Sequence, residues 1–399
     1  MPPIVNYSLL VQTTLTNFFF FAGLNCFVLL PVYVQGLGGT EIAIGIVMGL
    51  YSAAGIVCQP LIGAWVDAFG RRPFLLLGIG AVLATMLVAA VSRSIVVLGV
   101  VRAVQGIGFS AFFVANYTLV LELVPPERRG WALGLYGVSG LMATALAPLA
   151  GEGIATAAGF RGLFAFAAVL ESVALALAWW SPRQPRRLTP LSAGLDTIRE
   201  SRHEVFHLHM VVAFFFGLGT GAIFTFMPTF GESLGVSTLA LFYTGYAGAA
   251  MLVRVAAGSL IDTQGRRAVI VPCMLVQTLT ASLLALLGLG LGRGADLPVL
   301  PFLFLAGVLA GGAHGFLYPG LAALVTDVTP ARRRGAVVGV FSAAVLTGNA
   351  VGAFAFGYIA HWLGYGQMWM VLALVLGLGY AMSAKLEEAP QHAKRRETS

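Results

Sequence analysis

GAWVDAFGRRP, residues 63–73, is a short run in which one acid, two glycines and two arginines interrupt an otherwise apolar chain. A related run, GSLIDTQGRRA, follows at residues 258–268. Of the 399 residues, 58% are hydrophobic and only 10% are charged. Soluble domains carry about 25% charged residues, so this chain cannot cover a water-exposed surface. We therefore expect an all-α polytopic membrane protein, with the lipid bilayer as its solvent.

Twelve apolar segments are long enough to cross the bilayer, which takes about 20 residues per helix. They are separated by polar, glycine-rich or arginine-rich breaks, and the polar stretch 181–206 divides them into two sets of six. The predicted spans are 11–34, 41–66, 74–92, 95–123, 131–157, 162–180, 207–230, 238–261, 268–291, 298–326, 336–359 and 365–384. We predict an N-terminal six-helix bundle at 1–180, a linker at 181–206, a C-terminal six-helix bundle at 207–384 and a tail at 385–399.

The basic residues are distributed unevenly between the two sides of the membrane. Eighteen Lys and Arg residues lie in the loops after the even-numbered spans and in the C-terminal tail, whereas the alternate loops hold three. This bias predicts that both termini are cytoplasmic, in an inner or plasma membrane. Because the arginines sit in short clusters between spans, the net charge of +7 does not indicate a nucleic-acid partner. Three isolated cysteines predict neither a metal site nor a cofactor.

The two halves repeat the same landmarks in the same order. The first loop motif recurs 195 residues later, and ELVPPERRG at 122–130 recurs as DVTPARRRG at 327–335. Each half has six predicted spans and starts on the same side of the membrane. This pattern favours parallel repeats, related by an axis along the membrane normal.

Twelve spans, a six-plus-six repeat and the loop motif G-x-x-x-D-x-x-G-R-R resemble the major facilitator superfamily of secondary transporters. The resemblance covers the whole chain. It implies two six-helix bundles that alternate access to a central site for a small-molecule substrate, with no cofactor and a monomeric protein. Neither a nucleotide-binding loop nor an H-E-x-x-H motif is present, so we do not expect an enzyme.

The loop motif predicts a gate latch on the cytoplasmic side. Gly70 suits a tight turn with positive φ, and Gly63 lets another helix approach closely. The resemblance implies that Asp67 meets the start of the eleventh helix, near Ala336. Glu122 is placed to pair with Arg71, and Asp327 with Arg266. The alternative is that these charges only set topology. The predicted latch residues are Gly63, Asp67, Gly70, Arg71, Arg72, Glu122, Asp262, Gly265, Arg266 and Asp327.

Three charged residues inside spans are candidates for proton coupling: Arg102, Glu152 and Glu171. Arg102 matches the R-x-x-x-G signature of the fourth span, whose arginine the family associates with proton coupling. Arg102 pairs with Glu152 across the fourth and fifth spans, or Glu152 has already emerged at the outer surface. Glu171 has either a transport role or a structural one. The run GLYGVSGLMATALAPLAGEG in the fifth span partly resembles the antiporter signature of drug exporters.

In this family, spans one, four, seven and ten line the central pathway. Polar and aromatic residues at the middles of these spans, with one arginine of the eighth span, are therefore candidate cavity residues. The alternative is that they form hydrogen bonds between helices. They are Asn17, Asn25, Asn116, Tyr117, Thr220, Thr225, Arg254, His314 and Tyr318. The cavity is expected to be weakly polar, rich in Phe and suited to a neutral or amphiphilic solute.

The sequence thus predicts a secondary active transporter that exports small amphiphilic or weakly polar compounds in exchange for protons. One alternative is a permease for a specific metabolite, such as a sugar, a siderophore-like molecule or a lysolipid. Another is a membrane receptor that keeps the fold without transporting.

Overall fold

The computed structural model describes residues 6–125, 128–181, 207–236, 238–256, 260–327 and 334–387, and within these ranges it contains helices and no strand. The elements are α1 (Tyr7–Asn25), the 3-10 turn η1 (Cys26–Leu29), α2 (Leu30–Gly36), α3 (Glu41–Phe69), α4 (Arg71–Val91), α5 (Ile95–Glu122), α6 (Arg129–Trp180), α8 (Leu208–Ser233), α9 (Ala240–Ala256), α10 (Leu260–Thr263), α11 (Arg266–Gly292), α12 (Val299–Asp327), α13 (Arg334–Leu363) and α14 (Tyr365–Ser383).

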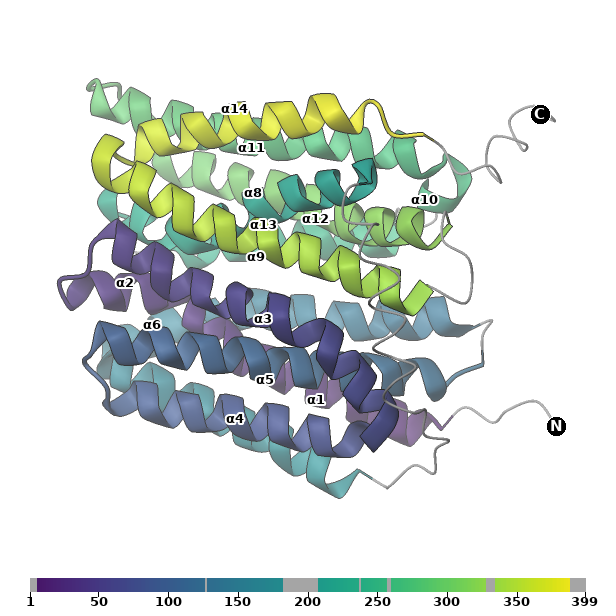
Figure 1. Cartoon of the computed structure of the whole chain (residues 1–399). Helices are drawn as coiled ribbons and strands as arrows, with labels where there is room; N and C mark the ends of the chain where they lie inside the picture. The colour runs from purple at the N-terminus through teal and green to yellow at the C-terminus, as the bar shows by residue number, and fades with distance from the viewer. Residues whose placement is uncertain are drawn as a thin grey trace.

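The long helices lie side by side, so that the molecule has two end faces (Figure 1). The start of α1 and the end of α14 lie at the same end, which we call the terminal face. The start of α3 and the end of α13 lie at the other end, the opposite face.

The predicted twelve spans are confirmed. Ten helices of the described chain are long and apolar enough to cross a membrane. One of them, Trp131–Trp180, is 50 residues long and holds two spans, and the shorter α9 supplies the twelfth with its 17 residues. The predicted linker and tail fall almost wholly on 182–206 and 388–399, which lie outside the described residues.

Glycine and proline set the breaks within and between the spans. Gly159 has φ 69° and ψ 180°, a conformation open essentially to glycine, and it separates the two spans inside α6. Gly70 and Gly265, with φ of 89° and 93°, turn the chain between α3 and α4 and before α11. The positive φ predicted for Gly70 is therefore observed. The first span is broken at η1, because Pro31 has no N–H to continue the helical ladder.

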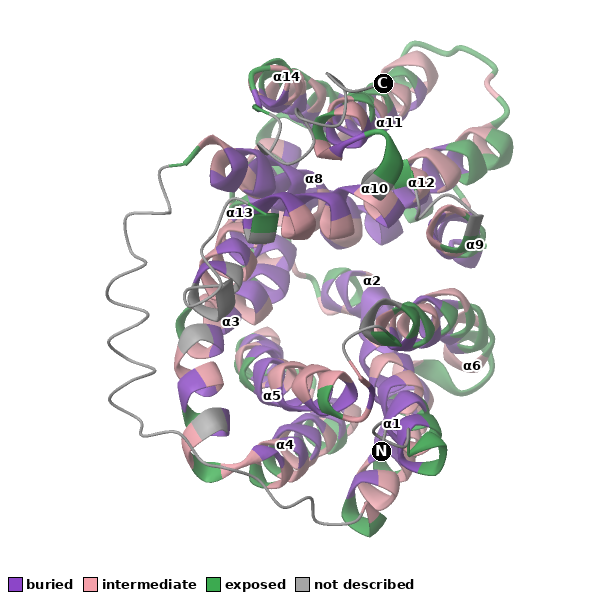
Figure 2. Ribbon diagram, turned by 90° about the vertical axis from the view of Figure 1, so that its right-hand side faces the viewer, coloured by how far each residue is buried: buried purple, intermediate pink, exposed green. Residues whose placement is uncertain are grey.

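The helices form two bundles, α1 to α6 and α8 to α14, which Figure 2 shows in a view onto the terminal face. Their hydrophobic cores are joined at one end only. One large cluster contains side chains of both bundles, including Phe27 and Met48 on one side and Met227 and Tyr243 on the other. Two smaller clusters are confined to single bundles, around Tyr136 and around Phe341. Both smaller clusters belong to the helix halves nearer the terminal face.

Candidate functional site

A cavity of about 850 Å³ lies between the two bundles. Its volume falls in the range of sites that bury small organic ligands, ~300–1,000 Å³. Residues of α1, α5, α8 and α12 line it, as the resemblance implied for spans one, four, seven and ten. The structure adds α3, α6, α9 and α13, so each bundle contributes four spans to the wall.

The cavity is open at the terminal face. Among its lining residues, Gly134, Ser342 and Ala323 lie within two turns or so of the terminal ends of their helices. A Cβ atom added at Gly63 or at Gly134 would meet no atom within 4 Å. Among the described residues, no other helix lies close to Gly63 in this conformation.

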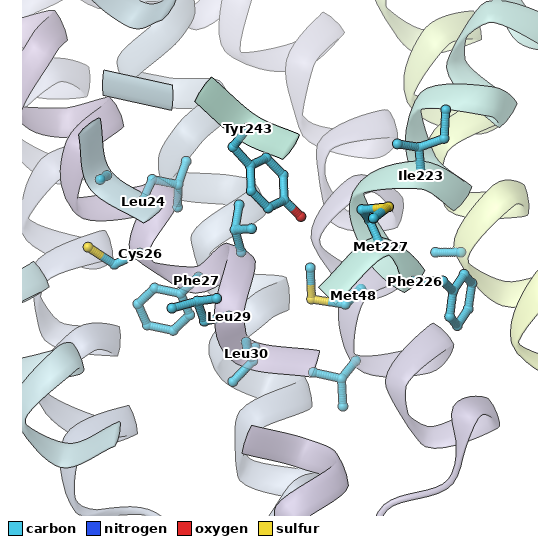
Figure 3. Close-up of a cluster of buried hydrophobic side chains, with 14 of the residues drawn as sticks. Leu24, Cys26, Phe27, Leu29, Leu30, Met48, Ile223, Phe226, Met227 and Tyr243 are labelled. Carbon is cyan, nitrogen blue, oxygen red and sulfur yellow. The ribbon is translucent and has the colours of Figure 1, made fainter. Parts of the chain in front are cut away.

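The opposite face is closed by apolar packing between the bundles. Figure 3 shows Phe27 and Met48 of the first bundle in one cluster of buried side chains with Met227 and Tyr243 of the second. All of these side chains are less than one-tenth exposed. Nearby, a Cβ at Gly45 on α3 would lie 3.3 Å from the Cα of Gly357 on α13, and closer still to another backbone atom of that helix. The two helices therefore touch directly. Water therefore reaches the cavity from one side only.

Two polar contacts reinforce this closure, each between one bundle and the other. Glu152 Oε1 on α6 accepts a hydrogen bond from the backbone N–H of Ala240, at the start of α9, over 2.8 Å. Glu41 Oε2 lies 3.0 Å from His361 Nδ1, at the far end of α13. A carboxylate at a helix N-terminus satisfies a free N–H group and interacts favourably with the helix dipole. Both contacts require the bundles to be together at the opposite face.

The cavity wall carries the same aromatic ladder twice. Residues of the second span recur in the eighth span 195 positions later. Residues of the fourth span recur in the tenth span 205 positions later, the offset that also relates Glu122 to Asp327. In both ladders a tyrosine ring lies 5.6 Å from the next ring, which stacks on a third ring one helical turn further. The ladders are Tyr51, Phe109 and Phe113 in the first half and Tyr246, His314 and Tyr318 in the second.

Two arginines line the cavity, one from each half. Arg102 is buried, donates from Nη1 to Gln105 Oε1 over 2.9 Å, and holds its guanidinium 4.3 Å above the centre of the Tyr51 ring. Arg254 reaches across the cavity, because a Cβ at Gly137 on α6 would lie 2.6 Å from its Nη1. Arg254 therefore extends into the cavity rather than away from it.

The Arg102–Glu152 ion pair suggested by the sequence is not formed. Arg102 has neutral partners on α5 and α3, whereas Glu152 is engaged at the start of α9. Glu171 is fully buried away from the cavity, where Oε2 would lie 2.8 Å from a Cβ at Gly23 and neither oxygen has a hydrogen-bond partner. The three candidates for proton coupling therefore occupy three separate places.

The loop-motif arginines make matching contacts in the two halves. Arg71 pairs with Glu122, and Arg266 Nε lies 3.0 Å from Asp327 Oδ2, which are the two pairs suggested by the repeat. Arg72 donates to the carbonyls of Trp179 and Ser181, and Arg267 donates to the carbonyl of Ala384. Each of these contacts joins helices of one half. The side chains of Asp67, Asp262 and Ala336 lie outside the described residues, so the latch between halves stays a prediction.

Eight of the nine candidate cavity residues line the cavity, and Asn116 does not. Asn116 is buried, and its Nδ2 lies 3.5 Å from the carbonyl of Thr13, so it serves helix packing. Asn17 and Asn25 combine both roles, since they face the cavity and also donate to Ser139 and Thr144 on α6.

Several lining residues escaped the sequence analysis, above all Tyr51, Gln59, Tyr246 and Asn349. Three of them belong to α3, which was not expected to face the cavity, and to α9, from which only Arg254 was expected. The repeat offset of 195 pairs Tyr51 with Tyr246 and Gln59 with Arg254. Applied to the candidate Arg254, this offset points to Gln59, whereas it relates Tyr51 only to Tyr246 and does not reach Asn349.

Comparison with known proteins agrees with this architecture. The sequence model of the Major Facilitator Superfamily matches residues 13–297 and 210–399. The staphylopine export protein of Staphylococcus aureus is 26% identical over 396 residues, which cover 95% of this chain and 96% of that protein. Multidrug resistance protein MdtG of Salmonella choleraesuis is 26% identical over 189 residues, covering 46% of this chain and 44% of that protein. The solved structure of the nucleoside transporter NupG has a TM-score of 0.78 at 16% identity, covering 95% of this chain and all of that one, which shows a shared fold.

Proposed function

Because the chain belongs to the major facilitator superfamily, we propose that this transporter exports small amphiphilic compounds in exchange for protons. Export is supported by the full-length similarity to a staphylopine export protein and by the partial similarity to a multidrug resistance protein. It is also supported by the glycine-rich fifth span, whose Pro148 lies inside α6.

The excess of basic residues in the loops of the terminal face supports a cytoplasmic location for that face. The cavity then opens to the cytoplasm and is sealed from the outside, ready to take up a solute from the cell. For export, the bundles must separate at the opposite face and meet at the terminal face. The Asp67 and Asp262 latch would act in that second state.

Glu152 carries the proposal of proton coupling. Its carboxylate joins the two bundles at the closed face, through the N–H of Ala240. In an antiporter, the empty deprotonated protein must stay in one state, whereas the protonated protein and the solute-loaded protein must both switch. The charged Glu152 holds the empty protein closed to the outside, since a charged acceptor makes the stronger hydrogen bond. Protonation weakens this bond and frees the bundles to move.

We expect Glu152→Gln to uncouple transport without abolishing it. The amide mimics the protonated acid, so the empty protein can switch without a proton. In proteoliposomes, downhill flux of dansyl-labelled amphiphiles should persist, whereas accumulation driven by a pH gradient should fall roughly tenfold, which corresponds to about 1.4 kcal/mol. The probes are dansylglycine, dansylglycinamide and dansylcadaverine, which carry negative, neutral and positive charge.

Glu232→Gln is the matched control, because Glu232 is an exposed acid near the same face. It should leave gradient-driven accumulation unchanged. Protein-free liposomes report passive permeation of each probe. The role of Glu152 is refuted if Glu152→Gln accumulates the probes as the native protein does, and proton coupling itself is refuted if a protonophore leaves native accumulation intact.

A further inference from the structure

We infer that the cavity binds an amphiphilic organic anion, with Arg254 and Arg102 as the counter-charges for its carboxylate or a similar oxyanion. The inference rests on the proposed function, in that the cavity is taken as the substrate site. It adds the charge of the substrate, which neither the sequence pattern nor the family assigns.

The charges that line the cavity are of one sign. Two arginines line it, and none of its described lining residues is Asp or Glu. The other polar groups in the wall are neutral, including Asn25, Gln59 and Asn349. Two acids inside the spans do not line the cavity. Glu152 is hydrogen-bonded to the start of α9, and Glu171 is enclosed within the first bundle. The empty cavity is therefore electropositive.

Arg102 has only neutral partners around its guanidinium. It is 7% exposed, and its contacts are one amide oxygen of Gln105 and the face of Tyr51. Its Nε is buried and has no hydrogen-bond partner. A buried arginine without a carboxylate is costly inside a membrane and is usually paired. Its missing partner can be supplied by the substrate.

Arg254 lies on the other side of the cavity in a similar situation. Its Nε is also buried without a hydrogen-bond partner, and its electrostatic neighbours are the ring of His314 and the phenols of Tyr246 and Tyr318. These neutral hydroxyl groups can donate to an oxyanion beside the guanidinium. The planar guanidinium donates two parallel N–H groups, which match a carboxylate.

The two arginines mark different depths of the pathway. Arg254 is 14 residues from the start of α9 at the opposite face, about 21 Å along the helix axis. Arg102 is seven residues from the start of α5 at the opposite face, about 10 Å along that axis. A solute entering from the terminal face therefore meets Arg254 first and Arg102 deeper in. The ring faces of Phe109, Phe113 and Phe224 offer apolar surface to the rest of the molecule.

The test is equilibrium binding of the three dansyl probes to the detergent-solubilised protein, followed by the fluorescence of the dansyl group. The probes share one apolar body and differ in charge. We expect dansylglycine to bind at least tenfold more tightly than dansylglycinamide, and dansylcadaverine to bind most weakly. Equal or weaker binding of the anion, compared with the amide or the amine, overturns the inference.

Two substitutions locate the effect. Arg254→Gln should lower the affinity for dansylglycine about tenfold and leave the affinity for dansylglycinamide unchanged. Arg254→Lys keeps the positive charge and should retain most of the dansylglycine affinity. If Arg254→Gln weakens all three probes equally, or none, Arg254 does not select the anion and the inference fails.

Binding at equilibrium needs no pH gradient and no transport, so the outcomes separate the two proposals. Proton-driven flux of the amide or amine without a preference for the anion would leave the proposed function standing and reject the anion. A clear anion preference without gradient-driven flux would reject proton coupling and keep the charge assignment.

Discussion

Gly106 and Gly311 allow the same backbone contact in the two halves. A Cβ at Gly106 would collide with the carbonyl oxygen of Tyr51, and a Cβ at Gly311 with that of Tyr246. These tyrosines are equivalent by the 195-residue offset, and the two glycines by the 205-residue offset. The glycines thus allow α5 to pack directly on the backbone of α3, and α12 on that of α9. This close packing fixes the distance between the tyrosine and the other rings of each ladder.

Gly311→Ala should therefore destabilise the protein, whereas Gly312→Ala should not. The methyl group at 311 forces α12 away from the α9 backbone, and overpacking of this kind costs about 1–3 kcal/mol. A Cβ at Gly312 meets no atom within 4 Å. Thermal unfolding of the two purified variants in detergent measures the difference. Equal melting temperatures for the two variants would contradict the close contact at Gly311.

Single residues were predictable where local spacing fixes their neighbours. The Arg71–Glu122 and Arg266–Asp327 pairs follow from two short motifs that the repeat aligns at one membrane boundary. The predicted Arg102–Glu152 pair is not formed, because the position of a residue along its helix does not fix which way its side chain faces. The positive charge of the cavity was missed because Arg102 and Arg254 come from different halves, and only the packing of the two bundles makes both line one cavity.

Among the elements, α6 shows how much a single residue decides. The predicted spans 131–157 and 162–180 correspond to one helical segment, Arg129–Trp180, broken only at Gly159. Hydropathy predicted the two spans but not the sharpness of the break, which a single glycine with positive φ makes. The first span, predicted as 11–34, is in turn interrupted by η1, which brings Asn25 and Phe27 to the cavity wall.

Gly159→Ala tests the break in α6. A side chain at φ 69° and ψ 180° is strained by about 1–3 kcal/mol, so the variant should unfold at a lower temperature. The space around the position is not the cause, because a Cβ there would meet no atom within 4 Å. Gly153→Ala is the matched control, since it also has no neighbour within 4 Å but lies at a helical position. If both variants unfold alike, the strained turn is not a determinant of stability.

At the scale of the whole molecule, the spans were predictable and the state of the gate was not. Hydropathy and charge bias depend on the membrane environment of each helix, which is the same in both states of a transporter. Which face is closed depends on contacts between halves, such as Glu41 with His361 and Glu152 with Ala240. These residues are more than 80 positions apart in the sequence, and no local pattern joins them.

Locking the opposite face should stop transport and also report its orientation. Glu41→Cys and His361→Cys place two thiols at the ends of α3 and α13, where the native side chains are 3.0 Å apart and partly exposed. A short, membrane-impermeant bis-thiosulfonate, which forms a disulfide with each thiol and releases sulfinate, should join them when added outside intact cells, because we assign this face to the exterior. Flux of the dansyl probes should then fall to the level of cells without the protein and recover when the bridge is reduced.

The single variants, treated with the same reagent, separate bridging from simple modification and should keep their flux. The native cysteines Cys26, Cys58 and Cys273 are free, so the pair is introduced into a chain in which these three are replaced by serine or alanine. Undiminished flux in the bridged protein would mean that the bundles need not part at this face, and alternating access would be rejected. Bridging only after the membrane is permeabilised would instead place this face in the cytoplasm. The cavity would then open outward, and Glu152 would sense the proton concentration of the cell interior.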